Sequence, residues 1–167
     1  MMSKLQADLQ LPPMAAPRIV IEKAKRKLAV FDGDSVVAEF SIGLGFAPEG
    51  DKAIEGDGRT PEGDFYIFTK NPESRFFLSL GISYPSREDA ERGLAEGLIS
   101  EEEHRAIADA IDEKRMPPQK TKLGGEIYIH SGGDKSDWTD GCIALKNNEM
   151  QALFDAIPVG TPVTIKP

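Results

Sequence analysis

The only cysteine of the sequence, Cys142, follows a glycine in a polar turn, and His130 precedes it in the same glycine-rich window. A glycine–cysteine turn leaves a thiol accessible, but a thiol with an ordinary pKa of about 8.5 is mostly protonated at neutral pH. A nearby imidazole can take that proton and later return one to a leaving amine. The pair therefore predicts an enzyme that breaks an amide bond through an acyl-cysteine intermediate, with Cys142 as nucleophile and His130 as base.

Backbone groups beside this pair could complete the chemistry. The carbonyl of Ser131 can accept the second ring N–H of His130 and so orient the base. The N–H groups of Gly141 and Cys142 are natural donors to the oxyanion that forms when a thiolate adds to a carbonyl. We therefore expect these four residues to form one catalytic group.

Three more side chains of this region are candidates for contact with a substrate: Trp138, Tyr128 and Asp140. Trp138 could form a wall of the substrate site, although an aromatic residue in a loop beside a core serves as often in packing. We expect the three residues to lie near the thiol.

The same residues allow other interpretations. A lone cysteine is commonly a buried, inert thiol, and it can also be a structural or redox-sensing group. A metal site could be built from five residues of the region, but their spacing matches no zinc pattern, so no metal is predicted. These five are His130, Asp134, Asp137, Asp140 and Cys142. His104 lies on a predicted surface helix and is expected to be solvated, without a role.

Composition narrows the function classes. The 167 residues include 20 basic and 28 acidic side chains, for a net charge of −8, which argues against nucleic acid as a partner. One cysteine cannot form an internal disulfide, and no apolar run reaches the roughly 18 residues of a membrane span. Residues 1–17 lack the continuous apolar core of a signal peptide. The chain is therefore expected to be either cytosolic or a mature form whose signal has been removed.

The pattern along the chain predicts a loose, proline-containing leader over residues 1–17 and a single domain over 18–167. Alternating apolar residues from Arg18 lead to Asp32-Gly33, a strong hairpin signal, and further strand patterns recur up to the C-terminus. Many short strands with few helices indicate a mainly-β fold of sandwich type.

Two helices are expected as an insertion over about residues 86–115, covering either the site or a sheet. Ser86 can cap the first helix and Gly97 can end it, while Ser100 and Glu103 form the capping box of the second. A last helix is expected to be capped by Asn147 or Asn148 and stopped before the closing strand.

The segment from His130 through Thr-Asp-Gly-Cys-Ile-Ala-Leu at 139–145 resembles the catalytic motif of the L,D-transpeptidase family, the YkuD-type domain. Further segments resemble that family in the same order along the chain: 58–65, which contains Thr-Pro-Glu-Gly, 80–85, 123–130 and 159–163. The resemblance covers roughly residues 18–167.

This resemblance implies a β-sandwich core with the cysteine and histidine at one end, no cofactor, and a location in the periplasm or cell envelope. It implies chemistry on peptidoglycan stem peptides. Cys142 would attack the carbonyl of the third stem residue, typically meso-diaminopimelate, and release the terminal D-alanine of a tetrapeptide. An amine acceptor would give transpeptidation, and water would give carboxypeptidase or amidase activity. A non-catalytic peptidoglycan-binding domain is a further alternative, and no oligomeric state is predicted.

The sequence departs from the commonest family motif, which reads Ser-His-Gly-Cys-x-Arg. Asp140 stands in place of the motif histidine and Ala144 in place of its arginine. The missing arginine removes a cation near the nucleophile, and Asp140 adds a negative charge that disfavours a thiolate. We therefore expect deprotonation of the Cys142 thiol to depend more strongly on His130. We also consider hydrolysis a serious alternative to transpeptidation. Ser131 stands where the family often has glycine, a change that leaves its carbonyl in place.

Overall fold

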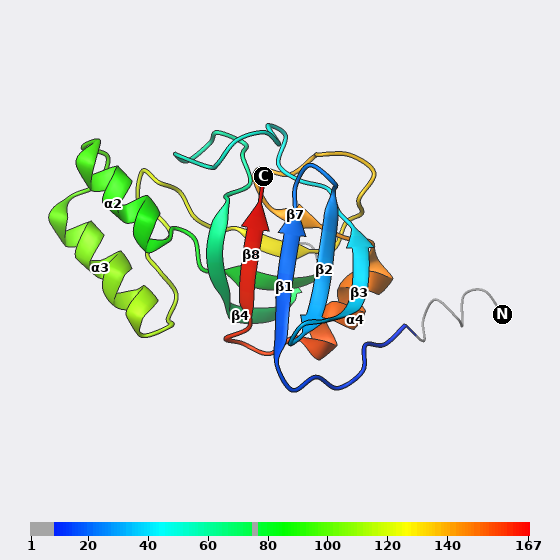
Figure 1. Cartoon of the computed structure of the whole chain (residues 1–167). Coiled ribbons are helices and arrows are strands. Elements are labelled where there is room, and N and C mark those ends of the chain that lie inside the picture. The colour runs from blue at the N-terminus through cyan, green and yellow to red at the C-terminus, as the bar shows by residue number, and fades with distance from the viewer. Residues whose placement is uncertain (1–8, 75–76) are drawn as a thin grey trace.

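The fold is a curled sheet of eight strands with three helices beside it (Figure 1), in a computed structural model that describes residues 9–74 and 77–167. The strand order is β3-β2-β1-β8-β4-β5-β6-β7. The strands are β1 (Pro17–Glu22), β2 (Lys27–Asp32), β3 (Ser35–Ser41), β4 (Gly63–Ser74), β5 (Phe77–Ile82), β6 (Tyr128–His130), β7 (Ile143–Ala144) and β8 (Pro162–Lys166). This architecture confirms the predicted mainly-β, sandwich-like fold.

Strands β1, β2 and β3 form an antiparallel meander, and the predicted hairpin at Asp32-Gly33 joins the last two. Alternation decides which face is buried: Ile19 and Ile21 point into the core, and Leu28 and Val30 of β2 do the same. Strand β8 pairs in parallel with β1, so the C-terminal segment lies in the middle of the sheet.

Strand β4 connects the two halves of the sheet. Its first part, from Gly63 to Tyr66, pairs with β8, whereas the part from Ile67 onward pairs with β5 after a register shift. A strand that bends in this way lets one sheet fold over itself and enclose a core. Helix α4 (Asn147–Ala156) contributes Met150 and Leu153 to that core.

The chain that leaves β3 closes the curl against the far edge of the sheet. Gly43 forms an antiparallel bridge with Ala144 of β7, and Gly45 forms a parallel bridge with Thr139. Strand β7 is therefore held from both sides, by β6 and by the segment after β3.

The predicted helical insertion consists of α2 (Arg87–Ala95) and α3 (Glu101–Asp112), which lie beside the sheet on the left of Figure 1. Both helices begin with a capping box, at Ser86 and at Ser100. The sequence predicted Ser86 as a helix cap and Ser100 as part of a capping box, and both predictions are confirmed. The pair has a small apolar cluster of its own, made of Ala90, Ile99, Ile107 and Leu123. Tyr66 of β4 ties it to the sheet, because its hydroxyl donates to the carbonyl of Arg115 at 2.5 Å.

The predicted asparagine cap of the last helix is wrong. The cap position of α4 is Lys146, which makes no side-chain cap bond, and Asn147 is the first helical residue. The Asn147 side-chain oxygen instead accepts the N–H of Gly132 at 3.1 Å, so this residue fastens the loop after β6.

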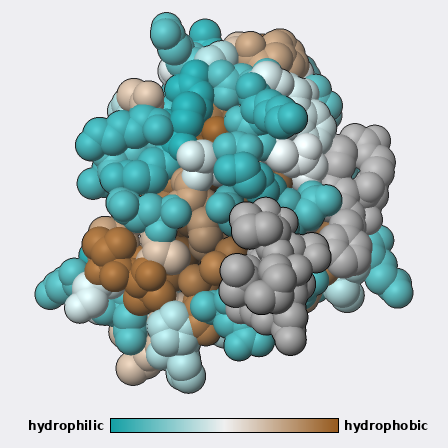
Figure 2. Space-filling model, turned by 90° about the vertical axis from the view of Figure 1, so that its right-hand side faces the viewer, coloured by the Kyte–Doolittle hydropathy of each residue, from teal (hydrophilic) through white to brown (hydrophobic). Residues whose placement is uncertain are grey.

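Of the predicted leader, residues 1–17, the structure describes 9–17: residues 9–16 form no helix or strand, whereas Pro17 begins β1, and residues 1–8 lie outside the described residues. Leu9, Leu11 and Met14 pack partly against the core. Seen from the side of β3 and α4, the surface is mostly hydrophilic in its upper part and carries a hydrophobic area lower down (Figure 2). In the described ranges, no helix combines the length and the apolar character that crossing a membrane requires.

A buried lysine at the turn after β1 fixes the glycine-rich segment 43–62. Lys23 is 2% exposed, and its Nζ donates to the carbonyls of Gly50 at 2.8 Å and Thr60 at 2.7 Å. It also forms an ion pair with Glu62 at 3.0 Å. A buried ammonium needs such partners, because desolvation of an unpaired charge is costly.

We expect Lys23→Met to lower the free energy of unfolding by about 3 kcal/mol, because it removes the cation from a largely buried carboxylate and two carbonyls. Chemical denaturation followed by circular dichroism measures this loss. Lys25→Met at the same turn is the matched control: the Lys25 side chain is 66% exposed, so its loss should stay below about 0.5 kcal/mol. Equal losses in the two variants would show that the segment does not depend on Lys23.

Candidate active site

The pairing of β6 with β7 brings the predicted base and nucleophile to one face. The strands run parallel with His130 opposite Ala144, so Tyr128 is level with Cys142, immediately before β7. Side chains two residues apart in a strand share a face, so His130 and Cys142 lie on the same face of the pair. Both line one open cavity of about 990 Å³.

The predicted partner of the base is in place. Nδ1 of His130 lies 2.5 Å from the carbonyl oxygen of Ser131. A carbonyl can only accept a hydrogen bond, so Nδ1 carries the proton and Nε2 of the neutral ring is the basic nitrogen. The ring is 1% exposed and packs edge-on against Trp138, with 5.5 Å between ring centroids. Its orientation is therefore set by both a hydrogen bond and a ring contact.

The thiol of Cys142 rests between two backbone groups. It donates to the carbonyl of Glu126 at 3.3 Å and accepts the N–H of Tyr128 at 3.4 Å. Burial raises the pKa of the Cys142 thiol to about 11, and the N–H of Tyr128 acts in the opposite direction. The carboxylates of Asp140 and Glu126 also raise this pKa, whereas Lys52 lowers it. The thiol is therefore neutral at rest and depends on a base.

The turn before the thiol corrects the expectation for Gly141. The Gly141 N–H donates to Thr139 Oγ1 at 3.1 Å, and the same hydroxyl donates to the carbonyl of Cys142 at 2.7 Å. An amide that is already bonded within the turn is not available to an oxyanion, so the structure does not support Gly141 as a donor. Glycine is needed here for another reason: a Cβ would meet the Arg59 carbonyl oxygen at 2.8 Å.

The three predicted substrate contacts, Trp138, Tyr128 and Asp140, all line the cavity. Trp138 is 40% exposed, and its indole N–H donates to the carbonyl of Gly133 at 3.1 Å. Burial raises the pKa of the half-buried Tyr128, and the carboxylate of Glu126 and the Cys142 sulfur, when it is ionised, add to this effect.

An ion pair holds the loop that carries Trp138. Asp137 accepts Nε and Nη2 of Arg26 at 3.0 and 2.8 Å, and it also accepts the N–H of Leu44 at 3.0 Å. Burial alone would raise the pKa of Asp137, but these bonds outweigh it and lower the pKa. The position of the Trp138 loop is therefore fixed by Arg26, which lies in the turn between β1 and β2, far away in the sequence.

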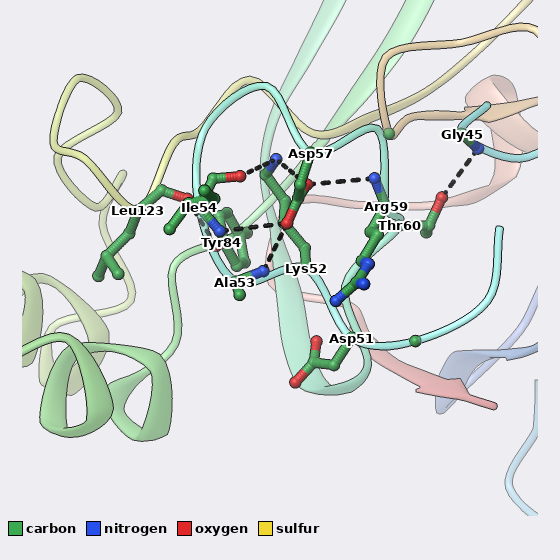
Figure 3. A network of polar contacts seen from close by, with 12 residues as sticks. Gly45, Asp51, Lys52, Ala53, Ile54, Asp57, Arg59, Thr60, Tyr84 and Leu123 are labelled. Atoms are coloured by element: carbon green, nitrogen blue, oxygen red, sulfur yellow. Dashed lines mark hydrogen bonds and ion pairs between the residues drawn. The ribbon is translucent and has the colours of Figure 1, made fainter. Parts of the chain in front are cut away.

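The sequence analysis missed Lys52, which is the only cationic side chain among the described residues that line the cavity. Lys52 is 3% exposed and pairs with Asp57 at 3.0 Å (Figure 3). The Asp57 carboxylate also accepts three backbone N–H groups, those of Ala53, Ile54 and Arg59. Burial opposes ionisation of Asp57, but these bonds prevail and lower its pKa. No spacing rule distinguishes a lysine folded back on its own loop, so the sequence offered no signal for it.

The five residues considered for a metal site do not gather. Asp137 is bound to Arg26, and Asp134 lies 3.7 Å from Lys146. Within the described part of the chain, no three His, Cys, Asp or Glu side chains are arranged to hold a metal ion.

The helical insertion contributes no lining to the cavity, as far as the described residues define it, so α2 and α3 do not cover the site. His104 lies half-buried on α3, also away from the cavity.

Comparisons with known proteins agree with this geometry. The family model of the YkuD L,D-transpeptidase catalytic domain matches residues 16–165. A comparison with curated protein sequences finds no match.

Solved structures show the same fold at low sequence identity. The chain is similar to the helical cell shape determining protein Pgp2 from Campylobacter jejuni, with 21% identity, a TM-score of 0.63 and coverage of 98% of this chain and 55% of that one. For an L,D-transpeptidase from Mycobacterium smegmatis the identity is 14%, the TM-score 0.54 and the coverage 90% and 58%. For the L,D-transpeptidase LdtMt1 in complex with imipenem, the identity is 15%, the TM-score is 0.51, and the coverage is 90% of this chain and 58% of that one. The chain thus spans little more than half the length of these structures.

We expect Gly132→Ala to displace the Trp138 ring from His130, because the new Cβ would meet the indole at 2.7 Å. Gly133→Ala is the matched control: it also has a positive φ, but a Cβ there meets nothing within 4 Å. Both variants should lose about 1–3 kcal/mol of stability from backbone strain. Only Gly132→Ala should shift the fluorescence of the single tryptophan to longer wavelength, and identical spectra would contradict the contact.

Asp140→Asn should lower the pKa of the Cys142 thiol, because it removes a negative charge that disfavours the thiolate. The pH dependence of alkylation by iodoacetamide reports this pKa, since the chain has one cysteine. The rate at neutral pH should rise by less than about tenfold, because the exposed carboxylate is screened by water. Asp155→Asn on α4 should leave the profile unchanged. An unchanged profile for Asp140→Asn would remove this residue from the electrostatics of the thiol.

Proposed function

Because this chain belongs to the family of YkuD-type L,D-transpeptidase catalytic domains, as its sequence predicts, we propose that it is a cysteine acyltransferase of peptidoglycan stem peptides. Cys142 is the nucleophile and His130 is the general base. One observation carries the proposal: the thiol and the imidazole share a face of β6–β7 and line one cavity, with Nε2 as the basic ring nitrogen. No metal or cofactor takes part in it.

The proposed reaction begins with proton transfer from Sγ of Cys142 to Nε2 of His130. The sulfur adds to the carbonyl carbon of the third stem residue, and the carbonyl oxygen takes up the electron pair. We assign its stabilisation to the Cys142 N–H, since the Gly141 N–H is used within the turn. Collapse breaks the C–N bond, D-alanine leaves with the imidazolium proton, and a thioester remains.

The second half of the reaction decides between transfer and hydrolysis. An amine or a water gives a proton to His130 and adds to the thioester, and collapse returns that proton to sulfur. Asp140 lines the cavity and adds a negative charge beside the nucleophile. Since it stands in place of the motif histidine, hydrolysis by the same acyl-enzyme is the alternative we retain.

Lys52, which lines the same cavity, also supports the proposal. Ala144 occupies the position of the motif arginine and is completely buried in β7, so no cation stands there. Lys52 lowers the pKa of the Cys142 thiol instead. We propose that Lys52 supplies the electrostatic support that the missing arginine would otherwise give.

The likeness to peptidoglycan enzymes also suggests a place of action in the periplasm or cell envelope, with stem peptides as partners. Pgp2 of Campylobacter jejuni is a helical cell shape determining protein. A role in cell-wall remodelling is the corresponding proposal for this chain.

Cys142→Ala should abolish product formation from muropeptides with tetrapeptide stems, because no other group can form the thioester. Incubation of the purified protein with such muropeptides, followed by mass analysis, distinguishes a crosslinked or exchanged product from simple loss of D-alanine. Thermal unfolding of the variant should match that of the parent to within a few degrees.

Imipenem provides a second readout, since it is bound in a solved structure of the same fold. Intact-mass spectrometry should find an adduct on the parent protein and none on Cys142→Ala. A parent protein that binds stem peptides without turnover, and stays unmodified after long incubation, would instead be a non-catalytic binding domain. If Cys142→Ala is less stable than the parent and the parent itself shows no turnover, the thiol would be structural or redox-sensing.

A further inference from the structure

The residue whose carbonyl receives the thiol proton has an uncommon backbone conformation. Glu126 has φ +57, one of three non-glycine residues with positive φ among the described residues. This left-handed region is unfavourable for a residue with a Cβ unless its surroundings hold it there. Its carbonyl accepts Sγ–H of Cys142 at 3.3 Å, so the conformation of Glu126 directs an acceptor at the proposed nucleophile.

The side chain of Gln119 holds Glu126 in this conformation. Its Oε1 accepts the N–H of Glu126 at 2.7 Å, while its Nε2 donates to the carbonyls of Tyr84 at 2.8 Å and Pro117 at 2.9 Å. The neighbouring Gly125 lies directly on the Gln119 backbone, where a Cβ would meet the carbonyl oxygen at 2.5 Å. Gln119 is therefore anchored at both ends of its amide, with one end fixing the peptide that precedes Glu126.

A carbonyl that accepts S–H stabilises the thiol and not the thiolate, because it offers a lone pair and no proton. The N–H of Tyr128 has the opposite preference. The charged and titratable groups that face the sulfur are the carboxylates of Asp140 and Glu126, the ammonium of Lys52, the phenol of Tyr128 and the imidazole of His130. The acceptor of the S–H group is the carbonyl of Glu126, which therefore directs this bond in the resting site.

We propose that Gln119 is a positioning residue, which acts through the Glu126 carbonyl to keep the resting Cys142 thiol protonated and directed. This inference rests on the proposed role of Cys142 as nucleophile. When the reaction begins, the hydrogen bond to the Glu126 carbonyl breaks and the proton passes from Sγ to Nε2 of His130, so the thiol is protected from adventitious alkylation and oxidation until then. Gln119 is not itself one of the residues that line the cavity, and it acts from behind the lining through the backbone of Glu126.

The test is the pH dependence of alkylation of the single thiol by iodoacetamide, in which the thiolate displaces iodide. In Gln119→Leu the Glu126 N–H loses its acceptor, the carbonyl is no longer aimed at Sγ, and the thiolate becomes easier to form. The alkylation rate at neutral pH should rise by between about twofold and tenfold, the range that one hydrogen bond supplies. Gln151→Leu, the same change on the exposed face of α4, should leave the rate unchanged.

A second pair of variants reaches the same peptide by another route and serves if Gln119→Leu does not fold. Glu126→Val and Glu126→Gln both remove the carboxylate, but only valine, being β-branched, strongly disfavours a positive φ. The valine variant should be alkylated faster than the glutamine variant at every pH below the thiol pKa. Thermal unfolding of each variant establishes that the comparison is made on folded protein.

Equal alkylation profiles in Gln119→Leu and the parent, or in the Val and Gln variants at 126, would overturn the proposal. The readout does not depend on turnover, so the two proposals can fail separately. A parent protein without activity on muropeptides, but with these shifts in alkylation, would refute the proposed function and leave the positioning of the thiol by Gln119 intact.

Discussion

The parallel pairing of β6 with β7 is the constraint on which the site depends. Two short strands put an imidazole opposite Ala144 and a thiol level with Tyr128, and a shift by one residue would send one of the two side chains to the other face. Such short strands cannot fix a register alone. The bridges of Gly43 with Ala144 and of Gly45 with Thr139 hold β7 from its other side, so closure of the sheet secures the register.

The electrostatics of the cavity explain why the base is necessary. Burial and two carboxylates favour the neutral thiol, while one ammonium and one backbone N–H oppose them. The balance differs from that of sites where a stable thiolate–imidazolium pair exists before substrate arrives. Here the hydrogen bond from Nδ1 of His130 to the Ser131 carbonyl leaves Nε2 as the basic nitrogen, and in the mechanism that we propose the proton transfer belongs to the reaction itself.

Local patterns in the sequence predicted what local physics decides. The Asp32-Gly33 hairpin and the capping box of Ser100 with Glu103 each depend on neighbours a few residues away, and both are present. The cap expected at Asn147 failed because a distant amide, that of Gly132, competes for its oxygen. Lys52 escaped notice for the same reason, since its place at the cavity depends on how a glycine-rich loop folds back. The thiol and the imidazole could be named as candidates from the sequence, because their chemistry marks them independently of the fold, and the structure places both at one cavity.

Strand β4 has a consequence for how the molecule comes apart. Its first residues pair with β8 in one half of the sheet, and its later residues pair with β5 in the other half. If one half unfolds, the other half therefore loses part of the strand that forms its edge. The halves therefore form one cooperative unit and melt in a single transition. Slow hydrogen exchange should therefore extend without a break from the central strands to β5.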